Sequence, residues 1–128
     1  MRAIFRVVLL VGTGLAACAD LGPAGPRRAS LSRFDVPATA AQTDTIRISF
    51  TYWLGCRETV QAMEVKPAYD SLGVTVWARD GDAACAWENE IFLRPFVSTY
   101  VALPPRAATY SVIFHGSGGD SVRVVTAR

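Results

Sequence analysis

Hydrophobic and polar residues alternate along much of the chain after residue 32, with the two-residue period of half-buried β-strands. The clearest run covers residues 45–52, whose even-numbered side chains are all apolar. Such alternation places one set of side chains on a buried face and the other set toward solvent. Further β-rich runs occur at residues 72–76, 97–103, 110–114 and 122–124. The pattern therefore predicts a domain built mainly of strands.

Glycine and proline residues mark the turns between these runs. Residues 115–120 read His-Gly-Ser-Gly-Gly-Asp, which is typical of a hairpin loop between two strands. Pro104 and Pro105 end the run before them, because proline cannot donate a ladder hydrogen bond. We expect a short first strand at residues 32–36 and an edge segment or a loop at residues 88–94.

The pattern is less regular in residues 57–66. Their apolar residues, Val60, Ala62, Met63 and Val65, change phase midway. A strand with a bulge, or a strand buried on both faces, would show this change. A single helix of two or three turns is the alternative, because Val60 and Met63 also have helical spacing. Since the neighbouring runs all have β character, we expect a strand.

The runs amount to about seven strands separated by turn signals, with no confident helix. Short strands at this spacing are typical of all-β domains. We expect a single antiparallel β-sandwich with immunoglobulin-like or fibronectin-III-like architecture over residues 32–128. A small closed β-barrel is the alternative.

The N-terminus has a different composition. Arg2 and Arg6 make the first residues of the chain basic. Residues 7–11 are apolar, and small residues then lead to Leu-Ala-Ala-Cys at positions 15–18. This layout resembles the signal peptide of bacterial lipoproteins. An ordinary secretory signal and an uncut membrane anchor are the alternatives. The apolar stretch is interrupted by Arg6 and by two glycines, which makes it too short to span a bilayer.

The resemblance to lipoproteins implies that Cys18 is acylated on its sulfur and that residues 1–17 are removed as a signal peptide. Lipid on Cys18 would hold the protein on a bacterial membrane, on the periplasmic or surface side of the cell envelope, because two anchoring signals already give stable attachment. Residues 18–31 contain two prolines and two glycines and have little to bury. After the lipidated cysteine we therefore expect a flexible linker.

Charge removes one class of function. The chain has a formal net charge of +2, but Arg2 and Arg6 belong to the predicted signal peptide, which leaves 11 of the 13 basic residues against 11 acidic ones. A domain with balanced charge lacks the basic face that nucleic acid requires. We expect no nucleic-acid partner.

Cys56 and Cys85 remain as a pair once Cys18 carries lipid. In an oxidising compartment such a pair predicts a disulfide, which would close a loop of about 30 residues and stabilise the domain by roughly 3.5 kcal/mol. A metal site is the alternative, but two cysteines 29 positions apart with one histidine, His115, make a poor zinc site. We expect a Cys56–Cys85 disulfide and no metal.

Residues 103–112 read Leu-Pro-Pro-Arg-Ala-Ala-Thr-Tyr-Ser-Val. This run is similar to the LPPGxYxVxV segment that precedes the last hairpin in many small secreted bacterial β-sandwich domains. Such domains also carry a glycine-cysteine pair before the third strand and a cysteine after the fourth, which Gly55-Cys56 and Cys85 match. Residues 106–108 depart from the pattern where a glycine is usual. The resemblance implies a fold and no common activity.

No catalytic constellation is recognisable. His115 stands at a strand end, and no motif places a nucleophile near it, so we expect a surface histidine. Asp80 and Asp82 lie in a loop that is too short for a calcium site and fits a polar turn. Glu88 and Glu90 lie on one side of a possible strand, where paired carboxylates could serve glycoside hydrolysis. We expect no enzyme activity and no cofactor.

Aromatic side chains are the feature that most suggests binding. Trp77 is expected on the polar face of its strand, where together with Tyr100 or Phe96 it could stack on a ligand. Trp53 and Trp87 are expected to pack over the disulfide as a small outer core, because a domain of this size needs its large side chains for burial.

Two functions are compatible with these expectations. One is a lipid-anchored, non-catalytic module that contacts another envelope protein through an edge strand or an aromatic patch, or that has a structural role. The other is a binder of envelope glycan or of a small apolar molecule through surface tryptophans. A contiguous exposed apolar strip on one sheet would favour the first, and a concave cleft with tryptophans would favour the second.

Replacing Cys18 with alanine should release the protein from bacterial membranes, because the sulfur carries the predicted lipid. Partition into the detergent phase measures this release. Cys56→Ala is the matched control, since it removes a thiol outside the predicted lipid site and should leave partitioning unchanged. A Cys18→Ala variant that still enters the detergent phase would contradict the lipid anchor.

Overall fold

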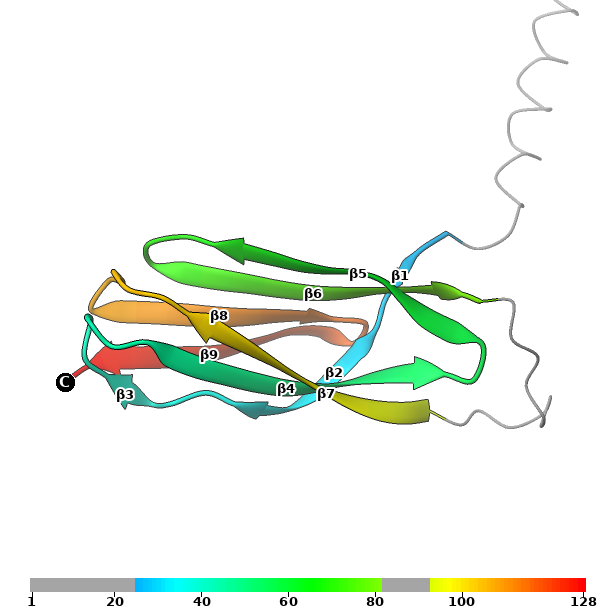
Figure 1. Ribbon diagram of the computed structural model, residues 1–128, viewed down its shortest axis with the longest axis horizontal. Coiled ribbons are helices and arrows are strands. Elements are labelled where there is room, and N and C mark those ends of the chain that lie inside the picture. The colour runs from blue at the N-terminus through cyan, green and yellow to red at the C-terminus, as the bar shows by residue number, and fades with distance from the viewer. Residues whose placement is uncertain (1–24, 82–92) are drawn as a thin grey trace, which may run out of the picture.

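The computed structural model describes residues 25–81 and 93–128, and in these ranges the chain forms nine β-strands and no helix (Figure 1). None of the described residues belongs to a helix that could cross a membrane. In chain order the strands are β1 (Arg27–Arg28), β2 (Ser30–Asp35), β3 (Thr39–Ala40), β4 (Ile46–Gly55), β5 (Glu58–Pro67), β6 (Ser71–Asp80), β7 (Leu93–Ala102), β8 (Thr109–Gly116) and β9 (Gly119–Ala127).

The strands form two sheets that lie one over the other (Figure 1). The smaller sheet has the order β2-β4-β7 and is antiparallel throughout. The larger sheet runs from β5 through β6, β8 and β9 to β3, and β1 also pairs with β6. Seven of the nine strands have six residues or more, while β1 and β3 have two residues each.

The expectation of purely antiparallel sheets is wrong at two places. Strands β6 and β8 pair in parallel, and so do β3 and β9. Parallel neighbours require a crossover connection between them. Between β6 and β8 the crossover includes β7, which lies in the other sheet, so the chain re-enters the larger sheet in the direction in which it left.

The core lies between the facing sides of the two sheets. Ile48 and Phe50 of β4, Val74 of β6 and Phe114 of β8 are fully buried or nearly so. These are alternating positions, as the sequence pattern predicts for β4, β6 and β8. Full burial of one such side chain stabilises a fold by about 1.5–3 kcal/mol, so these positions hold the layers together.

Strand β9 does not bury the two valines of the 122–124 run, which the alternating pattern predicts on the core face. Val122 and Val124 are each 50% exposed, whereas Val125 is buried. Val122 pairs with Ile113, which precedes the buried Phe114 and so lies on the opposite, outer face of β8. The pairing register with β8 therefore turns the two valines toward solvent.

Strand β5 confirms the expected strand over residues 57–66 in place of a helix. Its pairing register with β6 shifts between Val60 and Ala62, which is a bulge or an irregularity of that kind. One extra residue at this point changes which side chains face the core. The phase change in the sequence has this origin.

The domain begins before residue 32, which corrects the expected linker over residues 18–31. Arg27 and Arg28 form β1 on β6, and Ala29 is only 2% exposed. Arg27 Nε donates to Glu58 Oε2 at 2.5 Å, and its Nη2 donates to Glu58 Oε1. Glu58 is buried and also accepts from the Gly55 N–H at 2.6 Å. Its carboxylate thus joins β1 to the turn between β4 and β5.

Candidate functional site

The structure separates the three residues expected to bind a ligand together. Trp77 lies between Val76 and Ala78, which are fully buried, so its side chain is on the outer face of the larger sheet. Phe96 and Tyr100 lie opposite Tyr52 and Ile48 of β4, on the inner face of the smaller sheet. The expected joint site of Trp77 with Tyr100 or Phe96 is therefore wrong.

The two described tryptophans, Trp53 and Trp77, each contact polar side chains of the protein itself. Trp77 donates its indole N–H to Glu64 Oε2 at 3.2 Å, and the guanidinium of Arg28 lies 5.8 Å from its ring. Hydrogen bonds from the Trp77 indole and from Lys66 keep the pKa of Glu64 below its usual value, with the Lys66 contact as the larger cause. Trp77 is thus held in a polar network of the larger sheet.

Trp53 has a similar arrangement on the smaller sheet. Its indole N–H donates to Ser32 Oγ at 2.7 Å, and Arg33 lies 5.7 Å from its ring. Arg33 has a positive φ of 53°, at the register shift between β2 and β4. The indole donors of both tryptophans are therefore already used within the protein.

The two sheets end side by side at β5 and β7, and we call this border the β5–β7 seam. Within the described residues β5 pairs with β6 alone and β7 pairs with β4 alone. The seam is bridged by a contact of 3.4 Å between Ser98 Oγ of β7 and Met63 Sδ of β5. The two strands are neighbours through side chains and not through a backbone ladder.

The seam exposes apolar side chains from both strands. Val97 is 74% exposed, and Leu93 and Val101 are exposed on the same outer side of β7. Met63 of β5 and Phe96 of β7 are also exposed, and Phe96 stacks on Tyr52 at 5.4 Å. Exposed apolar residues that adjoin one another mark interaction surfaces more often than scattered ones do.

The opposite border of the two layers is closed. Phe34 of β2 stacks on Phe114 of β8 at 4.3 Å, and Arg123 of β9 lies 5.1 Å from the Phe34 ring. Thr126 donates from both its backbone N–H and its hydroxyl to the Ala38 carbonyl. Apolar and polar contacts thus close the border between β2 and the larger sheet, which lies opposite the β5–β7 seam.

A cleft of about 320 Å³ opens where the β5–β6 turn meets the β7–β8 connection, and we call it the tyrosine cleft. Tyr69 and Leu103 lie on its exposed side, and Tyr100 and Tyr110 lie deeper. The Ala107 N–H donates to the Tyr69 carbonyl at 2.9 Å and joins the two connections. Sequence reasoning identified Tyr100 as a candidate binding residue and missed the other three.

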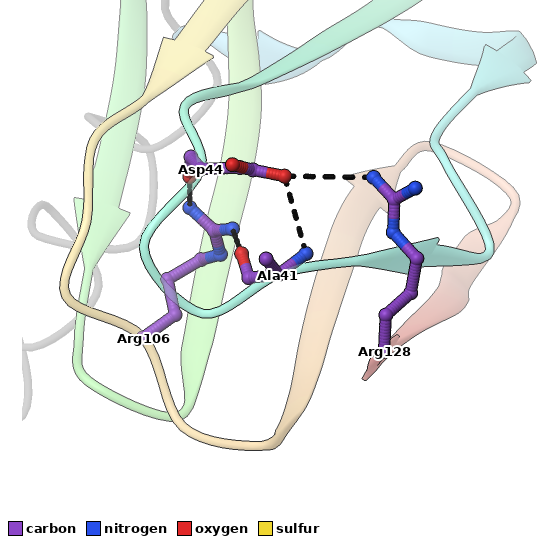
Figure 2. Close-up of polar contacts among 4 residues, drawn as sticks. All are labelled: Ala41, Asp44, Arg106 and Arg128. Carbon is purple, nitrogen blue, oxygen red and sulfur yellow. Dashed lines mark hydrogen bonds and ion pairs between the residues drawn. The ribbon is translucent and has the colours of Figure 1, made fainter.

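Arg106 is a buried cation beside this cleft (Figure 2). Its guanidinium donates to the carbonyls of Asp44 and Ala41, the second at 2.8 Å, while its own carbonyl accepts from Gln42. Figure 2 shows the Asp44 carboxylate turned instead toward Arg128 and the Ala41 N–H. The Arg106 guanidinium therefore holds the loop before β4 through backbone oxygens.

Arg106 stands where the similar LPPGxYxVxV segment has a glycine, and that departure was the signal in the sequence. The side chain of Arg106 is only 3% exposed. The sequence could not predict this burial, because arginine in a polar segment between two strands is normally solvated. Sequence reasoning also missed Glu58, which lies in the region of the β4–β5 turn at the other end of the domain (Figure 1).

Several predicted site residues lie outside the described residues. These are Cys18, Asp82, Cys85, Trp87, Glu88 and Glu90. Cys56 lies in the turn between β4 and β5, and its pairing with Cys85 stays a prediction. His115 is partly exposed at the end of β8, where its Nδ1 lies 2.9 Å from Asp120 Oδ1. The described ranges contain no group of three or more metal-ligating side chains.

Comparison with known proteins gives no family. No protein-family model, curated protein or solved structure matches the chain.

Replacing Arg106 with methionine should lower the free energy of unfolding by about 2–4 kcal/mol, because two loop carbonyls lose charged donors of about 1.5–3 kcal/mol each while some packing of the stem is kept. Urea unfolding measures the change. Arg128→Met is the matched control, because Arg128 is 65% exposed and its contact to Asp44 is 3.5 Å, so we expect a change within about 0.5 kcal/mol. Equal effects of the two variants would contradict the role of Arg106 in holding the loop before β4.

Proposed function

We propose that this chain is a lipid-anchored, non-catalytic module of the bacterial cell envelope that binds a partner protein through the β5–β7 seam. The observation that carries the proposal is the exposure of Val97, Val101 and Leu93 along β7, the outer strand of the smaller sheet. These three side chains lie along the outer face of β7, while Phe96 and Met63 add exposed apolar surface on the other side of that strand, toward β5. Exposed apolar surface of this kind favours protein interaction over ligand binding.

Strand β7 is well suited to receive a further strand. It pairs with β4 without a register shift from Leu93 to Ala102, and no other strand of the described residues pairs with it, so within these residues its second edge is long and regular. Edge strands are commonly protected by charges or bulges. Strand β5 has both protections, in its register shift near Val60 and in its Glu64–Lys66 ion pair of 3.1 Å. Strand β7 has one charged residue, Arg94, and one proline, Pro95.

The partner we infer is an extended, mainly apolar segment of another envelope protein. Added to β7 in β-augmentation, it would gain main-chain hydrogen bonds and would cover alternate side chains such as Val97 and Val101. Burial of an exposed valine in this way contributes about 1.5–3 kcal/mol. Pro95 has no N–H to donate, which shortens the useful part of the edge to the residues after it.

The lipid anchor places this edge near the membrane. Cys18 and Arg27 are about nine residues apart, which limits the tether to roughly 30 Å at full extension. This reach is shorter than the reach of the linker expected over residues 18–31. A domain on so short a tether samples partners in the same membrane at a high effective concentration.

Two finer structural proposals accompany this function. We take the two-layer fold as an immunoglobulin-like sandwich, supported by its seven longer strands and its antiparallel smaller sheet, although the parallel β6–β8 pair departs from that pattern. We also retain the Cys56–Cys85 disulfide. It is supported by the Gly81 N–H, which donates to the carbonyl of Arg57 at 2.5 Å and so brings the chain before Cys85 close to Cys56.

Glycan binding through tryptophans has less support. The indole donors of Trp53 and Trp77 are bonded to Ser32 and Glu64, so a sugar could use only the faces of these rings. Arginine side chains lie over both rings as well. At the seam Arg94 lies 5.7 Å from the Phe96 ring, whereas the side chains of Val97 and Val101 remain exposed.

A photo-crosslinking amino acid at position 97, introduced in cells that make the native lipidated protein, should trap a specific partner protein. The matched control is position 124 on β9, an exposed valine far from the seam in the sheet order. We expect a discrete adduct from position 97 that is absent at position 124 and is abolished by Val101→Asp. The same adducts from both positions, or none from position 97, would overturn the proposal.

A further inference from the structure

The tyrosine cleft has the size of a small-molecule site. Its volume of about 320 Å³ lies at the lower end of the range for ligand pockets. An apolar cavity of about 150 Å³ holds one benzene ring, so this cleft has room for a ring with a short side chain. It lies between the β5–β6 turn and the β7–β8 connection, away from the central part of the β5–β7 seam.

The walls of the cleft are aromatic and aliphatic. Tyr69, Tyr100 and Tyr110 contribute rings, and Leu72 and Leu103 contribute aliphatic surface. Burial raises the pKa of Tyr110, which keeps its phenol neutral. Tyrosines of this kind offer a flat apolar surface together with a hydroxyl that donates or accepts a hydrogen bond. Leu103, at 70% exposed, is a large apolar side chain left at the mouth.

The described residues that line the cleft carry positive charge and no negative charge. Arg106 is the one charged residue among those that line it, and no aspartate or glutamate does so. The described part of the chain gives Arg106 two carbonyl acceptors and no carboxylate. A guanidinium has five N–H donors, and a buried cation without an anion is costly. Arg106 is thus the one positive charge among the residues that line the cleft, and its hydrogen bonds in the described residues go to carbonyl oxygens and not to a carboxylate.

We propose that the tyrosine cleft binds a small organic anion with an apolar ring, of the class of aromatic carboxylates. The ring would stack between the tyrosines, and the carboxylate would lie on the side of Arg106, where its charge compensates the guanidinium. A cation of the same shape would meet the field of Arg106 and bind more weakly. The cleft adjoins one end of the proposed partner-binding seam at Tyr100 and Ala102 but does not include Val97, so variants at Tyr69 and Val97 distinguish the failure of one proposal from the failure of the other.

The test is a titration of the ¹⁵N-labelled mature domain followed by amide chemical shifts. The probes are 3-phenylpropionate, 3-phenylpropan-1-ol and 3-phenylpropylamine, which share one ring and differ in charge. We expect saturable shifts at Tyr69 and Leu103 with the carboxylate, at least about fivefold weaker binding of the alcohol, and weaker binding still of the amine. Raised salt should reduce the difference between the three probes.

Two variants locate the site. Tyr69→Ala should weaken binding of 3-phenylpropionate by about fivefold or more, and because Tyr69 is 62% exposed we expect the domain to remain folded. Val97→Ala, on the seam, is the matched control and should leave the affinity unchanged. The proposal would be overturned if 3-phenylpropionate gave no saturable shifts up to about 10 mM. Equal affinities for the three probes, or equal effects of the two variants, would also overturn it.

Discussion

The fold depends on three phenylalanine rings that pack between the two sheets. Phe114 of β8 stacks on Phe34 of β2 at 4.3 Å and lies 5.6 Å from Phe50 of β4. Such pairs contribute about 0.5–1.5 kcal/mol each beyond the area they bury. The rings join the sheets on the side of β2, whereas at the seam the described residues are bridged by the contact of Met63 with Ser98. One border of the fold is therefore tightly packed and the other is open.

This asymmetry gives the domain its two candidate surfaces. At the seam, β7 has a regular edge in the described part of the chain, and its exposed side chains Val97 and Val101 lie on the outer face, away from the larger sheet. The cleft arises where the two connections that leave β5 and β7 come together, and the hydrogen bond between Ala107 and Tyr69 keeps them adjacent. Two buried charges, Glu58 and Arg106, fix the loops at either end by hydrogen bonds to backbone groups.

Much of the secondary structure could be predicted from the sequence, because alternation reports directly on which face of a strand is buried. Strand β4 follows this rule from Ile46 to Phe50, although Thr51 on its other face is also buried. The phase change near Val60 correctly indicates a bulge in β5. Alternation does not say which strand lies beside which. The parallel pairing of β6 with β8 depends on a crossover through the other sheet, and the register that exposes Val122 depends on β8.

The candidate sites were less predictable for a related reason. Arg27 and Arg106 lie in polar segments, where charged side chains are normally solvated. Their partners are 31 and 62 residues away, at Glu58 and Asp44. Trp77 lies on the outer face of its strand, as the sequence predicts, but it is partly buried, and its neighbours there are Arg28 and Glu64 and not Tyr100. The local sequence pattern does not report contacts between segments that are far apart in the chain, so sites built from such contacts are hard to predict.

Native-state hydrogen exchange of the isolated domain tests the open seam most directly. Strand β8 is paired on both sides, so its amides should exchange slowly. In β7 the amides bonded to β4 should be protected, and the alternate amides that face the free edge should exchange rapidly. Uniform protection of β7 at the level of β8 would contradict an open border and, with it, the proposed surface for a partner.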